Sequence, residues 1–526
     1  MFTWHQKVAL AALCGIMASY TFAAEAPKSV DSSTTVTIDT GTLKGSDAYG
    51  VVSFKGIPYA APPVGDLRWR APQPAAPWKG TRDATSTGAS CLPVVKQGKN
   101  NDETADEFSE DCLYLNVWRP ATTAQKLPVM VWIHGGGFLN GSGSAPTFDG
   151  SHYAMHGVVL VTLNYRLGRL GFFALPALTA ESPNGVLGNY GLMDQIAALK
   201  WVQRNIASFG GDPGNVTIFG ESAGGMSVQA LLTSPLTKGL FARAVCESGL
   251  GRPNHDAPLD EPTIQHAEKV GEAYANSMGI NPASKDALAK LRALPAQATR
   301  VNVAKSGPEK TYSGPMIDGK LVIGIPDDVY RAGGGAPVEL MIGATDADLG
   351  NQGPRTPDEA KAFFGPLLDK AVAAYDPDGN GGNAAYREMG TDQEMIEPAR
   401  YAAKIYSARG LTAYEYRFSY VPVSERGSVK GAKHASDNGF VFGTYGGRDH
   451  KLAPADQAMT DAMVAYWSNF AKTGNPNSNG LPVWPKYSAE SDSLMNFTVD
   501  GPVAMKDPRK AKLDVMEAAE SAASAH

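Results

Sequence analysis

Continuous apolar runs mark three segments in the first half of the chain. A strand that helices cover on both faces has such a run, whereas a half-exposed strand alternates apolar and polar residues. The pattern therefore predicts buried strands in LPVMVWI at 127–133, VVLVTLNY at 158–165 and NVTIFG at 215–220. Similar runs predict further strands within 337–344 and 413–418.

A helical pattern lies between the second and third of these runs. Within 191–211, apolar residues recur at steps of three and four, and two glycines follow them. This spacing predicts a helix whose apolar face consists of Leu192, Ile196, Leu199, Val202, Ile206 and Phe209. The order strand, helix, strand predicts right-handed crossovers, and hence an α/β protein with a mostly parallel, twisted central sheet flanked by helices.

The rest of the sequence has no boundary between independent domains. Two stretches, near 260–310 and 357–409, are richer in alanine, lysine and glutamate and have helical periodicity. We interpret them as helical insertions over the sheet. The sequence contains no internal repeat, low-complexity linker or break in composition, so we expect residues 25–526 to form a single domain.

Composition narrows the classes of function. The 526-residue chain is 43% hydrophobic and 19% charged, with a formal net charge of -6. Basic runs interleaved with aromatic residues are missing from the sequence, so we expect no nucleic-acid partner. Beyond the first residues no apolar segment is long enough to span a bilayer, so we expect no stable membrane anchor.

The first residues have the pattern of a secretion signal. Two basic side chains precede an apolar run at 8–22, and the small residues Ala23 and Ala24 follow it. The pattern predicts that residues 1–24 are a signal peptide cleaved near Ala24, so that the mature protein is secreted or periplasmic. Cys14 follows a leucine rather than a small residue, so we expect cleavage and not lipid attachment.

Removal of the signal peptide leaves three cysteines. In an oxidising compartment, one disulfide and one free thiol is the simplest arrangement. Cys91 and Cys112 flank a polar, acidic stretch, and closing it covalently would lower the entropy of the unfolded chain. Cys246 lies in the apolar run RAVCES, where a thiol usually behaves as a small buried hydrophobic group.

A candidate nucleophile lies where the third predicted strand ends. Residues 220–224 read GESAG, directly after NVTIF and directly before a helical stretch. A serine in such a sharp strand-to-helix turn needs small neighbours on both sides, and its hydroxyl is exposed beside amides at a helix N-terminus. This setting favours Ser222 as a nucleophile over a serine that only caps a helix.

Three glycines after the first predicted strand are suited to an oxyanion hole. Residues 134–138 read HGGGF, and a backbone without side chains can bend there and offer consecutive amides to a ligand. We expect Gly136 and Gly137, with the amide of Ala223 that follows the nucleophile, to form the hole. An ordinary glycine turn at a strand end is the alternative.

A serine nucleophile also needs a base, and in a site of this kind the chain order is nucleophile, acid, histidine. His434, His450 and His526 lie late enough in the chain. His526 is the last residue and His450 lies in a polar surface stretch, whereas His434 lies in a glycine-bounded loop after the strand predicted within 413–418. We therefore expect His434 to be the base.

The acid should lie between these residues, at the end of a strand. The sequence MIGATDADLG at 341–350 offers Asp346 and Asp348, which spacing does not separate. A buried carboxylate there would hold the imidazole tautomer and stabilise the imidazolium of the transition state. Either aspartate could instead only cap the following turn.

Six blocks of the sequence agree with a single protein family: FKGIPYAAPPVGDLRWRAP, SEDCLYLNVW, VMVWIHGGGFLNGSG, NYRLGRLGFF, NYGLMDQIAALKWVQRNIASFGGDPGNVTIFGESAGG and RAVCESG. With these blocks the chain resembles the type B carboxylesterase family, which includes microbial esterases, some fungal lipases and the cholinesterases. The resemblance covers nearly all of the expected mature chain. It implies an α/β-hydrolase fold with helical insertions over the active site, hydrolysis of a small-molecule carboxylic ester, and no cofactor or metal. It also implies a catalytic triad of Ser222, an acid and His434. It further implies a disulfide between Cys91 and Cys112, and a structural ion pair between Arg68 and Glu110.

The chain departs from the family at two points. Family members usually carry glutamate as the acid, and the family pattern places the acid at Asp348, with Asp346 as the alternative. Aspartate is one methylene shorter, so its loop or His434 must come closer. Cholinesterases hold a tryptophan in the first disulfide loop that stacks on a quaternary ammonium, and the loop between Cys91 and Cys112 has none. A choline ester is therefore not an expected substrate.

Two other functions share these features. An amidase or thioesterase would use the same triad, because the acyl-enzyme chemistry is the same. Some family members are non-catalytic binding proteins, but these typically lose the serine or the histidine, and both are present here. A basic cluster could favour anionic esters at the entrance, or could be an ordinary solvated helix face: Lys285, Lys290, Arg292, Arg300, Lys305 and Lys310.

Overall fold

The computed structural model describes residues 33–96, 108–122, 124–182, 185–249, 251, 263–304, 307–350, 353–447 and 451–523. The predicted signal peptide at 1–24, with Cys14, and the alternative histidines His450 and His526 lie outside the described residues. Across the described ranges, no helix combines the length and the apolar character that crossing a bilayer requires.

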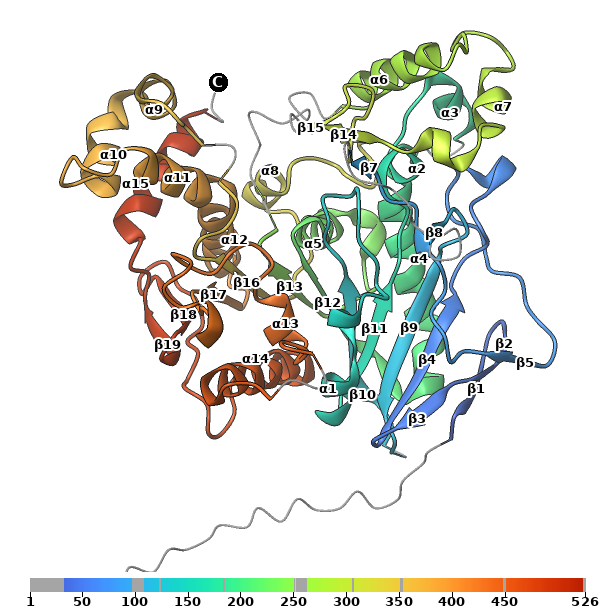
Figure 1. Ribbon diagram of the computed structural model, residues 1–526, viewed down its shortest axis with the longest axis horizontal. Coiled ribbons are helices and arrows are strands. Elements are labelled where there is room, and N and C mark those ends of the chain that lie inside the picture. The colour runs from blue at the N-terminus through green and yellow to red at the C-terminus, as the bar shows by residue number, and fades with distance from the viewer. Residues whose placement is uncertain are drawn as a thin grey trace, which may run out of the picture.

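One twisted sheet forms the centre of the protein (Figure 1). Among the described residues it has 11 strands, in the order β19-β18-β17-β16-β13-β12-β10-β11-β9-β4-β3. The central strands pair in parallel: β18 (Ser493–Thr498), β17 (Ala413–Phe418), β16 (Glu339–Thr345), β13 (Arg243–Glu247), β12 (Gly211–Glu221), β10 (Leu127–Ile133) and β11 (Val159–Leu163). The edge strands pair antiparallel: β19 (Gly501–Lys506) at one edge, and β9 (Tyr114–Pro120), β4 (Val51–Pro58) and β3 (Ser46–Ala48) at the other. The five strands predicted from apolar runs are confirmed.

Within the described ranges, short strands outside the central sheet form three small sheets. They are β1 (Thr35–Ile38) with β2 (Gly41–Lys44) and β5 (Thr81–Asp83), β7 (Val95–Lys96) with β14 (Asn302–Ala304) and β15 (Gly307–Pro308), and β6 (Ser90–Cys91) with β8 (Phe108–Ser109).

Helices cover both faces of the central sheet, which explains why its strands are continuously apolar. Val129 and Val131 of β10 belong to one core, which also contains residues of α4 (Tyr190–Asn205), α5 (Ala223–Thr233) and α12 (Glu397–Ala408). Met130 and Trp132 point to a second core, with residues of α1 (Ser151–Met155), α13 (Asn438–Val441) and α14 (Pro454–Thr473). The apolar face predicted for 191–211 is confirmed, because all six of its residues are buried in the first core.

Helices from the two predicted insertions rise on opposite sides of the sheet as two lobes (Figure 1). One lobe contains α3 (Pro176–Glu181), α6 (Ile264–Ser277) and α7 (Ala287–Arg292), and the other contains α9 (Pro357–Phe364), α10 (Leu368–Tyr375), α11 (Asn383–Thr391) and the C-terminal α15 (Lys510–Ala523). Two short helices, α2 (Gly168–Gly171) and α8 (Pro326–Arg331), complete the α-helices of the described residues. At the end of the second stretch, α12 packs on β16 and β17 and buries Ala403 and Tyr406 in the first core. That residues 25–526 form one domain stays a prediction.

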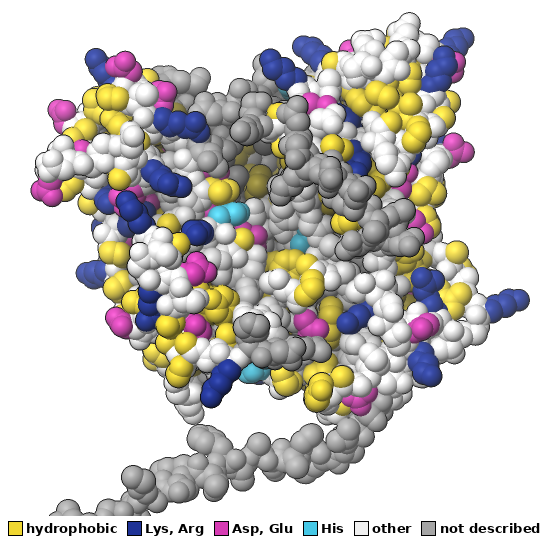
Figure 2. All heavy atoms as spheres, in the orientation of Figure 1, with side chains coloured by type: hydrophobic (Ala, Val, Ile, Leu, Met, Phe, Trp, Pro, Cys, Tyr) yellow, Lys and Arg dark blue, Asp and Glu magenta, His cyan; other side chains and the backbone are white. Residues whose placement is uncertain are grey.

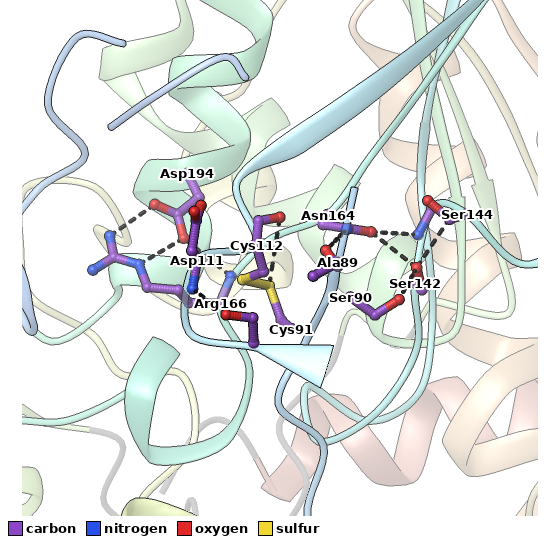
Figure 3. Close-up of a disulfide and its surroundings, with 12 residues drawn as sticks. Ala89, Ser90, Cys91, Asp111, Cys112, Ser142, Ser144, Asn164, Arg166 and Asp194 are labelled. Atoms are coloured by element: carbon purple, nitrogen blue, oxygen red, sulfur yellow. Dashed lines mark hydrogen bonds and ion pairs between the residues drawn. A yellow bond between two sulfur atoms is a disulfide. The ribbon is translucent and has the colours of Figure 1, made fainter. Parts of the chain in front are cut away.

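A disulfide joins Cys91 to Cys112, beside the ion pair of Arg166 with Asp194 (Figure 3). Cys246 is free and fully buried, as its apolar run predicts. The ion pair that the family resemblance implies is also present, since Arg68 Nε lies 2.5 Å from Glu110 Oε1. Arg68 also donates to the backbone oxygens of α7 and of the segment that follows it, so this pair ties the disulfide loop to one lobe.

The basic cluster does not form one solvated face. Arg292 is 8% exposed and pairs with Glu181 on α3. Arg300 donates to the backbone oxygens of Pro93 and Val94, so both arginines hold neighbouring segments together. Lys290 pairs with Asp286 one helical turn away, and Lys305 lies outside the described residues.

Candidate active site

Ser222 occupies the sharp turn between β12 and α5. Its backbone has φ 56° and ψ -124°, a conformation with positive φ that few residues other than glycine adopt. A Cβ on Gly220 would lie 2.6 Å from the backbone of Gly224, and a Cβ on Gly224 would lie 2.0 Å from the Ile133 carbonyl oxygen. The glycines of GESAG are therefore required by space, and the turn they permit leaves the Ser222 side chain partly exposed.

His434 lies within hydrogen-bond distance of Ser222. Its Nε2 atom is 2.9 Å from Ser222 Oγ, and its Nδ1 atom is 2.5 Å from Asp348 Oδ1. The three side chains come from segments far apart in the sequence: Ser222 directly follows β12, Asp348 lies in the loop after β16, and His434 lies in the longer loop after β17. In this arrangement Nδ1–H donates to the carboxylate, which leaves Nε2 free to accept the serine proton.

The Asp348 carboxylate is held by several donors. Its Oδ2 atom accepts hydrogen bonds from Ser248 Oγ at 2.7 Å and Thr345 Oγ1 at 2.8 Å, and its Oδ1 atom accepts one from the Leu349 amide at 2.7 Å. Burial raises the pKa of Asp348, but the hydrogen bonds from His434 and Ser248 outweigh it and hold this pKa below its usual value. The group is therefore a buried anion beside the imidazole.

Asp346 has a different task. Its Oδ1 atom accepts a hydrogen bond from the Ala432 amide at 2.7 Å, and Ala347 N–H donates to the Ala432 carbonyl. These contacts join the loop after β16 to the loop that carries His434. Of the two candidate aspartates, the structure brings Asp348 to the imidazole and places Asp346 as an anchor of the loop.

The glycine run at 134–138 lies against the nucleophile turn. A Cβ on Gly135 would lie 2.7 Å from the Glu221 carbonyl oxygen, so the two backbones approach as closely as glycine allows. Gly136 and Gly137 have φ values of 108° and 65°, which a residue with a side chain rarely adopts. The predicted donors, Gly136, Gly137 and Ala223, therefore belong to two backbone segments in close contact.

His134 holds this glycine run. Its Nδ1 donates to the Gly135 carbonyl at 2.8 Å, its ring stacks on Tyr165, and the Tyr165 hydroxyl donates to the His134 carbonyl. Burial lowers the pKa of His134 to about 4, so the ring is neutral at physiological pH. The predicted motif HGGGF thus uses its histidine as a support and not as a base.

Sequence reasoning missed Glu221, which lies beside His434. Its Oε1 atom is 3.2 Å from His434 Nε2, and its side chain is 4% exposed. Burial raises the pKa of Glu221 to about 8, and burial likewise raises that of the neighbouring Asp437 to about 6. In the sequence, a glutamate at the end of an otherwise apolar, buried strand is the feature that could have identified Glu221 as part of the site.

The carboxylates of Asp348 and Glu221 control the pKa of His434. Burial lowers the pKa of His434, but the hydrogen bond to Asp348 and the charge of Glu221 outweigh it and raise this pKa to about 9. Because only the neutral imidazole can accept a proton, we expect kcat/KM to rise with pH and to reach half its maximum near this pKa.

Replacement of Glu221 by glutamine should move that midpoint to lower pH, because the substitution removes one of the charges that stabilise the imidazolium. A pH–rate profile of both proteins at constant ionic strength measures the shift. An unchanged midpoint, or one displaced to higher pH, would show that Glu221 does not control the titration of His434.

The space-filling view shows the surface hollowed between the two helical lobes, with histidine side chains visible inside the hollow (Figure 2). In the described part of the chain, no group of three or more His, Cys, Asp or Glu side chains is arranged to hold a metal ion. The geometry suits nucleophilic attack by an activated serine hydroxyl.

Comparisons with known proteins agree with one another. The family model described as "Carboxylesterase family" matches residues 32–372 and 373–516. Para-nitrobenzyl esterase of Bacillus subtilis (strain 168) is 37% identical over 477 residues, which cover 87% of this chain and 93% of that protein. Fumonisin B1 esterase of Sphingopyxis macrogoltabida is 35% identical over 488 residues, which cover 87% of this chain and 85% of that protein.

A solved structure of a PNB esterase superposes with a TM-score of 0.76 at 35% identity, covering 92% of this chain and all of that one. Its fold is that of the α/β-hydrolases, which agrees with the parallel sheet and flanking helices described above. The chain therefore belongs to the carboxylesterase family, and it is a carboxylic ester hydrolase.

Proposed function

We propose that this esterase acts through Ser222 as nucleophile, His434 as general base and Asp348 as the acid that orients the imidazole. The observation that carries the proposal is the unbroken chain of hydrogen bonds, 2.9 Å from Ser222 Oγ to His434 Nε2 and 2.5 Å from His434 Nδ1 to Asp348 Oδ1. The first distance allows proton transfer from the serine to the imidazole, and the second is that of a hydrogen bond that orients the imidazole.

The reaction divides into two transfers of the acyl group. Ser222 Oγ attacks the ester carbonyl carbon while His434 Nε2 takes its proton, and Asp348 stabilises the resulting imidazolium. The imidazolium then gives that proton to the departing alcohol oxygen, which leaves an acyl-enzyme. Water deprotonated by His434 attacks this acyl group, and Ser222 regains a proton as the carboxylic acid departs.

The negative charge on the carbonyl oxygen needs donors in both steps. We propose that the amides of Gly136, Gly137 and Ala223 supply them. The proposal is supported by the close approach of the glycine run to the nucleophile turn and by the position of Ala223 at the start of α5, where amides have no partner within the helix.

The substrate class can be tested against the amidase alternative. We expect p-nitrophenyl butyrate to be hydrolysed at least about a hundredfold faster, by kcat/KM, than the p-nitroanilide of the same acid, because the ester has the better leaving group. Both reactions release a coloured product and can be followed in the same instrument. Comparable rates would favour an amidase. A panel of neutral and carboxylate-bearing esters would then measure which acyl groups the enzyme prefers.

We further propose that the protein is exported and matures by cleavage near Ala24. The proposal is supported by the signal-like pattern at 1–24 and by the disulfide between Cys91 and Cys112. Mass spectrometry of the exported protein without reduction should find a new N-terminus close to residue 25 and a linked pair of peptides. An intact N-terminus, or free thiols at both positions, would contradict export by this route.

A further inference from the structure

The loop that carries Asp348 is tied to the C-terminal segment of the chain as well as to the loop of His434. Arg509 lies between β19 and α15, and its Nη2 atom donates to the Asp346 carbonyl oxygen at 2.7 Å. On the other side of the same loop, Thr391 Oγ1 donates to the Asp348 carbonyl oxygen at 3.2 Å. Backbone atoms on both sides of the Asp348 side chain therefore have partners from elements outside the central sheet.

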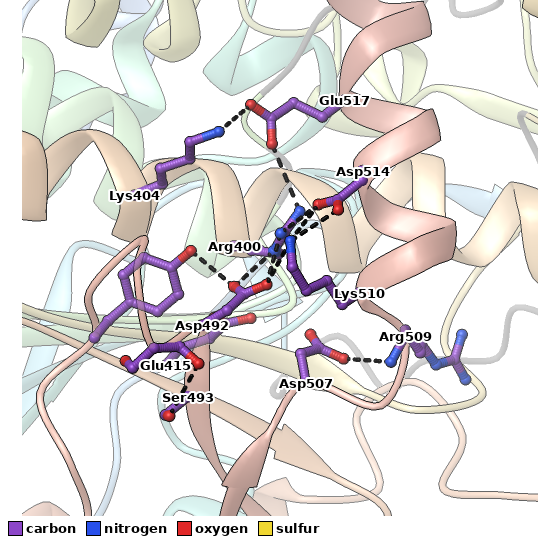
Figure 4. A network of polar contacts seen from close by, with 12 residues as sticks. Arg400, Lys404, Glu415, Asp492, Ser493, Asp507, Arg509, Lys510, Asp514 and Glu517 are labelled. Atoms are coloured by element: carbon purple, nitrogen blue, oxygen red, sulfur yellow. Dashed lines mark hydrogen bonds and ion pairs between the residues drawn. The ribbon is translucent and has the colours of Figure 1, made fainter. Parts of the chain in front are cut away.

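The guanidinium of Arg509 is itself fixed by a buried anion. Its Nη1 atom lies 2.6 Å from Oδ1 of Asp392, a side chain with no exposed surface, and 3.5 Å from Glu388 Oε1. The Tyr375 hydroxyl donates to the other oxygen of Asp392 at 2.9 Å. Asp507 Oδ1 also accepts the Arg509 amide at 2.7 Å, so the backbone of Arg509 is held too (Figure 4).

We propose that Arg509 is a positioning residue, whose guanidinium donates to the Asp346 carbonyl and so fixes the distance between Asp348 and His434. The inference rests on the proposed function of Asp348 and His434. Aspartate is a short acid, and the 2.5 Å contact to His434 leaves little tolerance for movement of its loop. A charged donor on a neighbouring carbonyl restricts that movement more firmly than a neutral one.

The test separates the donor to Asp346 from the ion pair with Asp392. Removing Arg509 alone would leave Asp392 buried without its cation and would destabilise the protein. The double variant Arg509→Met with Asp392→Asn removes both charges together, so the buried region keeps no unpaired ion while the Asp346 carbonyl loses its donor. Asp392→Asn alone keeps that donor in place, because the side-chain oxygen of asparagine can still accept the hydrogen bond from Arg509 Nη1.

A second buried arginine provides a matched control. Arg400 on α12 is 4% exposed and pairs with Asp492, which also accepts a hydrogen bond from a tyrosine hydroxyl, that of Tyr487 (Figure 4). The partners of Arg400 lie in the segment before β18 and in α15. The double variant Arg400→Met with Asp492→Asn therefore removes a similar pair of charges but leaves the donor to the Asp346 carbonyl in place.

We expect the Arg509→Met/Asp392→Asn enzyme to lose about tenfold or more in kcat per active site, with KM within about twofold of the wild type. Active sites are counted by titration with a fluorophosphonate, and melting temperatures are recorded for every variant. Asp392→Asn alone and the Arg400→Met/Asp492→Asn control should keep kcat within about twofold, whatever their loss of stability.

Two results would overturn the inference. One is a kcat for the Arg509→Met/Asp392→Asn enzyme equal to that of the control, and the other is an equal loss in Asp392→Asn alone. Arg509→Lys keeps the charge but has one donor group instead of a fork. If the double variant does not accumulate, Arg509→Lys carries the test, and wild-type kcat in that protein would also overturn the inference.

Ser222→Ala is measured in parallel, because residual turnover there would contradict the proposed function itself. An inactive Ser222→Ala enzyme, in contrast, leaves only the role of Arg509 in question.

Discussion

Replacement of Ser222 by alanine is expected to lower kcat/KM for a short nitrophenyl ester by at least about 10⁴-fold. The Ser222 hydroxyl is the atom proposed to attack the ester, and it lies 2.9 Å from the imidazole that would take its proton. The backbone strain at φ 56° is the same for alanine, because both residues carry a Cβ. Stopped-flow or steady-state assays therefore measure the loss of chemistry, while the melting temperature should change little.

A serine on α5, the helix that follows Ser222, provides the control. Ser227 is fully buried, donates to the Ala223 carbonyl at 2.9 Å and accepts a hydrogen bond from Gln195. Ser227→Ala should cost stability, because it leaves Gln195 without this acceptor, yet it should retain most of the activity. If the two alanine variants kept similar turnover, the nucleophile would have to be another residue.

The second large effect is expected at Asp348. Asparagine at this position should lower kcat by about 10³- to 10⁴-fold, because a neutral amide neither stabilises the imidazolium nor fixes the required tautomer of His434. Asp346→Asn should lower it far less, since the amide oxygen of asparagine can still accept the hydrogen bond from the Ala432 backbone. Steady-state kinetics of both variants at the same pH give the comparison.

The ranking of these two variants decides which aspartate is the acid. Because the Asp348 carboxylate is buried among several donor groups, the Asp348→Asn variant is also expected to lose stability, so rates are expressed per titrated active site. A larger loss in Asp346→Asn than in Asp348→Asn would transfer the role to Asp346 and contradict the hydrogen-bond geometry.

Sequence patterns predicted the parallel centre of the fold because a strand that is buried on both faces has a continuous run of apolar residues. The five segments read as continuous apolar runs are all strands of one sheet. Helical periodicity, in contrast, does not say what a helix packs against. Within the stretch 357–409, for example, α9, α10 and α11 lie in one lobe, whereas α12 packs on β16 and β17 of the sheet.

The site was predictable where local chemistry requires particular residues. The turn at Ser222 requires glycines on both sides, and the glycine run at 134–138 must approach a neighbouring backbone. The choice between Asp346 and Asp348 was not predictable from spacing, because it depends on which side chain of a loop turns toward His434. Glu221 and Arg509 escaped notice for a related reason, since their partners lie far away in the sequence.

The central claim is that Ser222 is the nucleophile of this carboxylesterase, and labelling tests it most directly. The enzyme is treated with a fluorophosphonate until activity is lost, digested, and analysed by peptide mass spectrometry. We predict one phosphonyl group per inactivated molecule, attached to Ser222, and much slower labelling when His434 is replaced by alanine. Inactivation with the label on another residue, or full activity in protein labelled at Ser222, would contradict the claim.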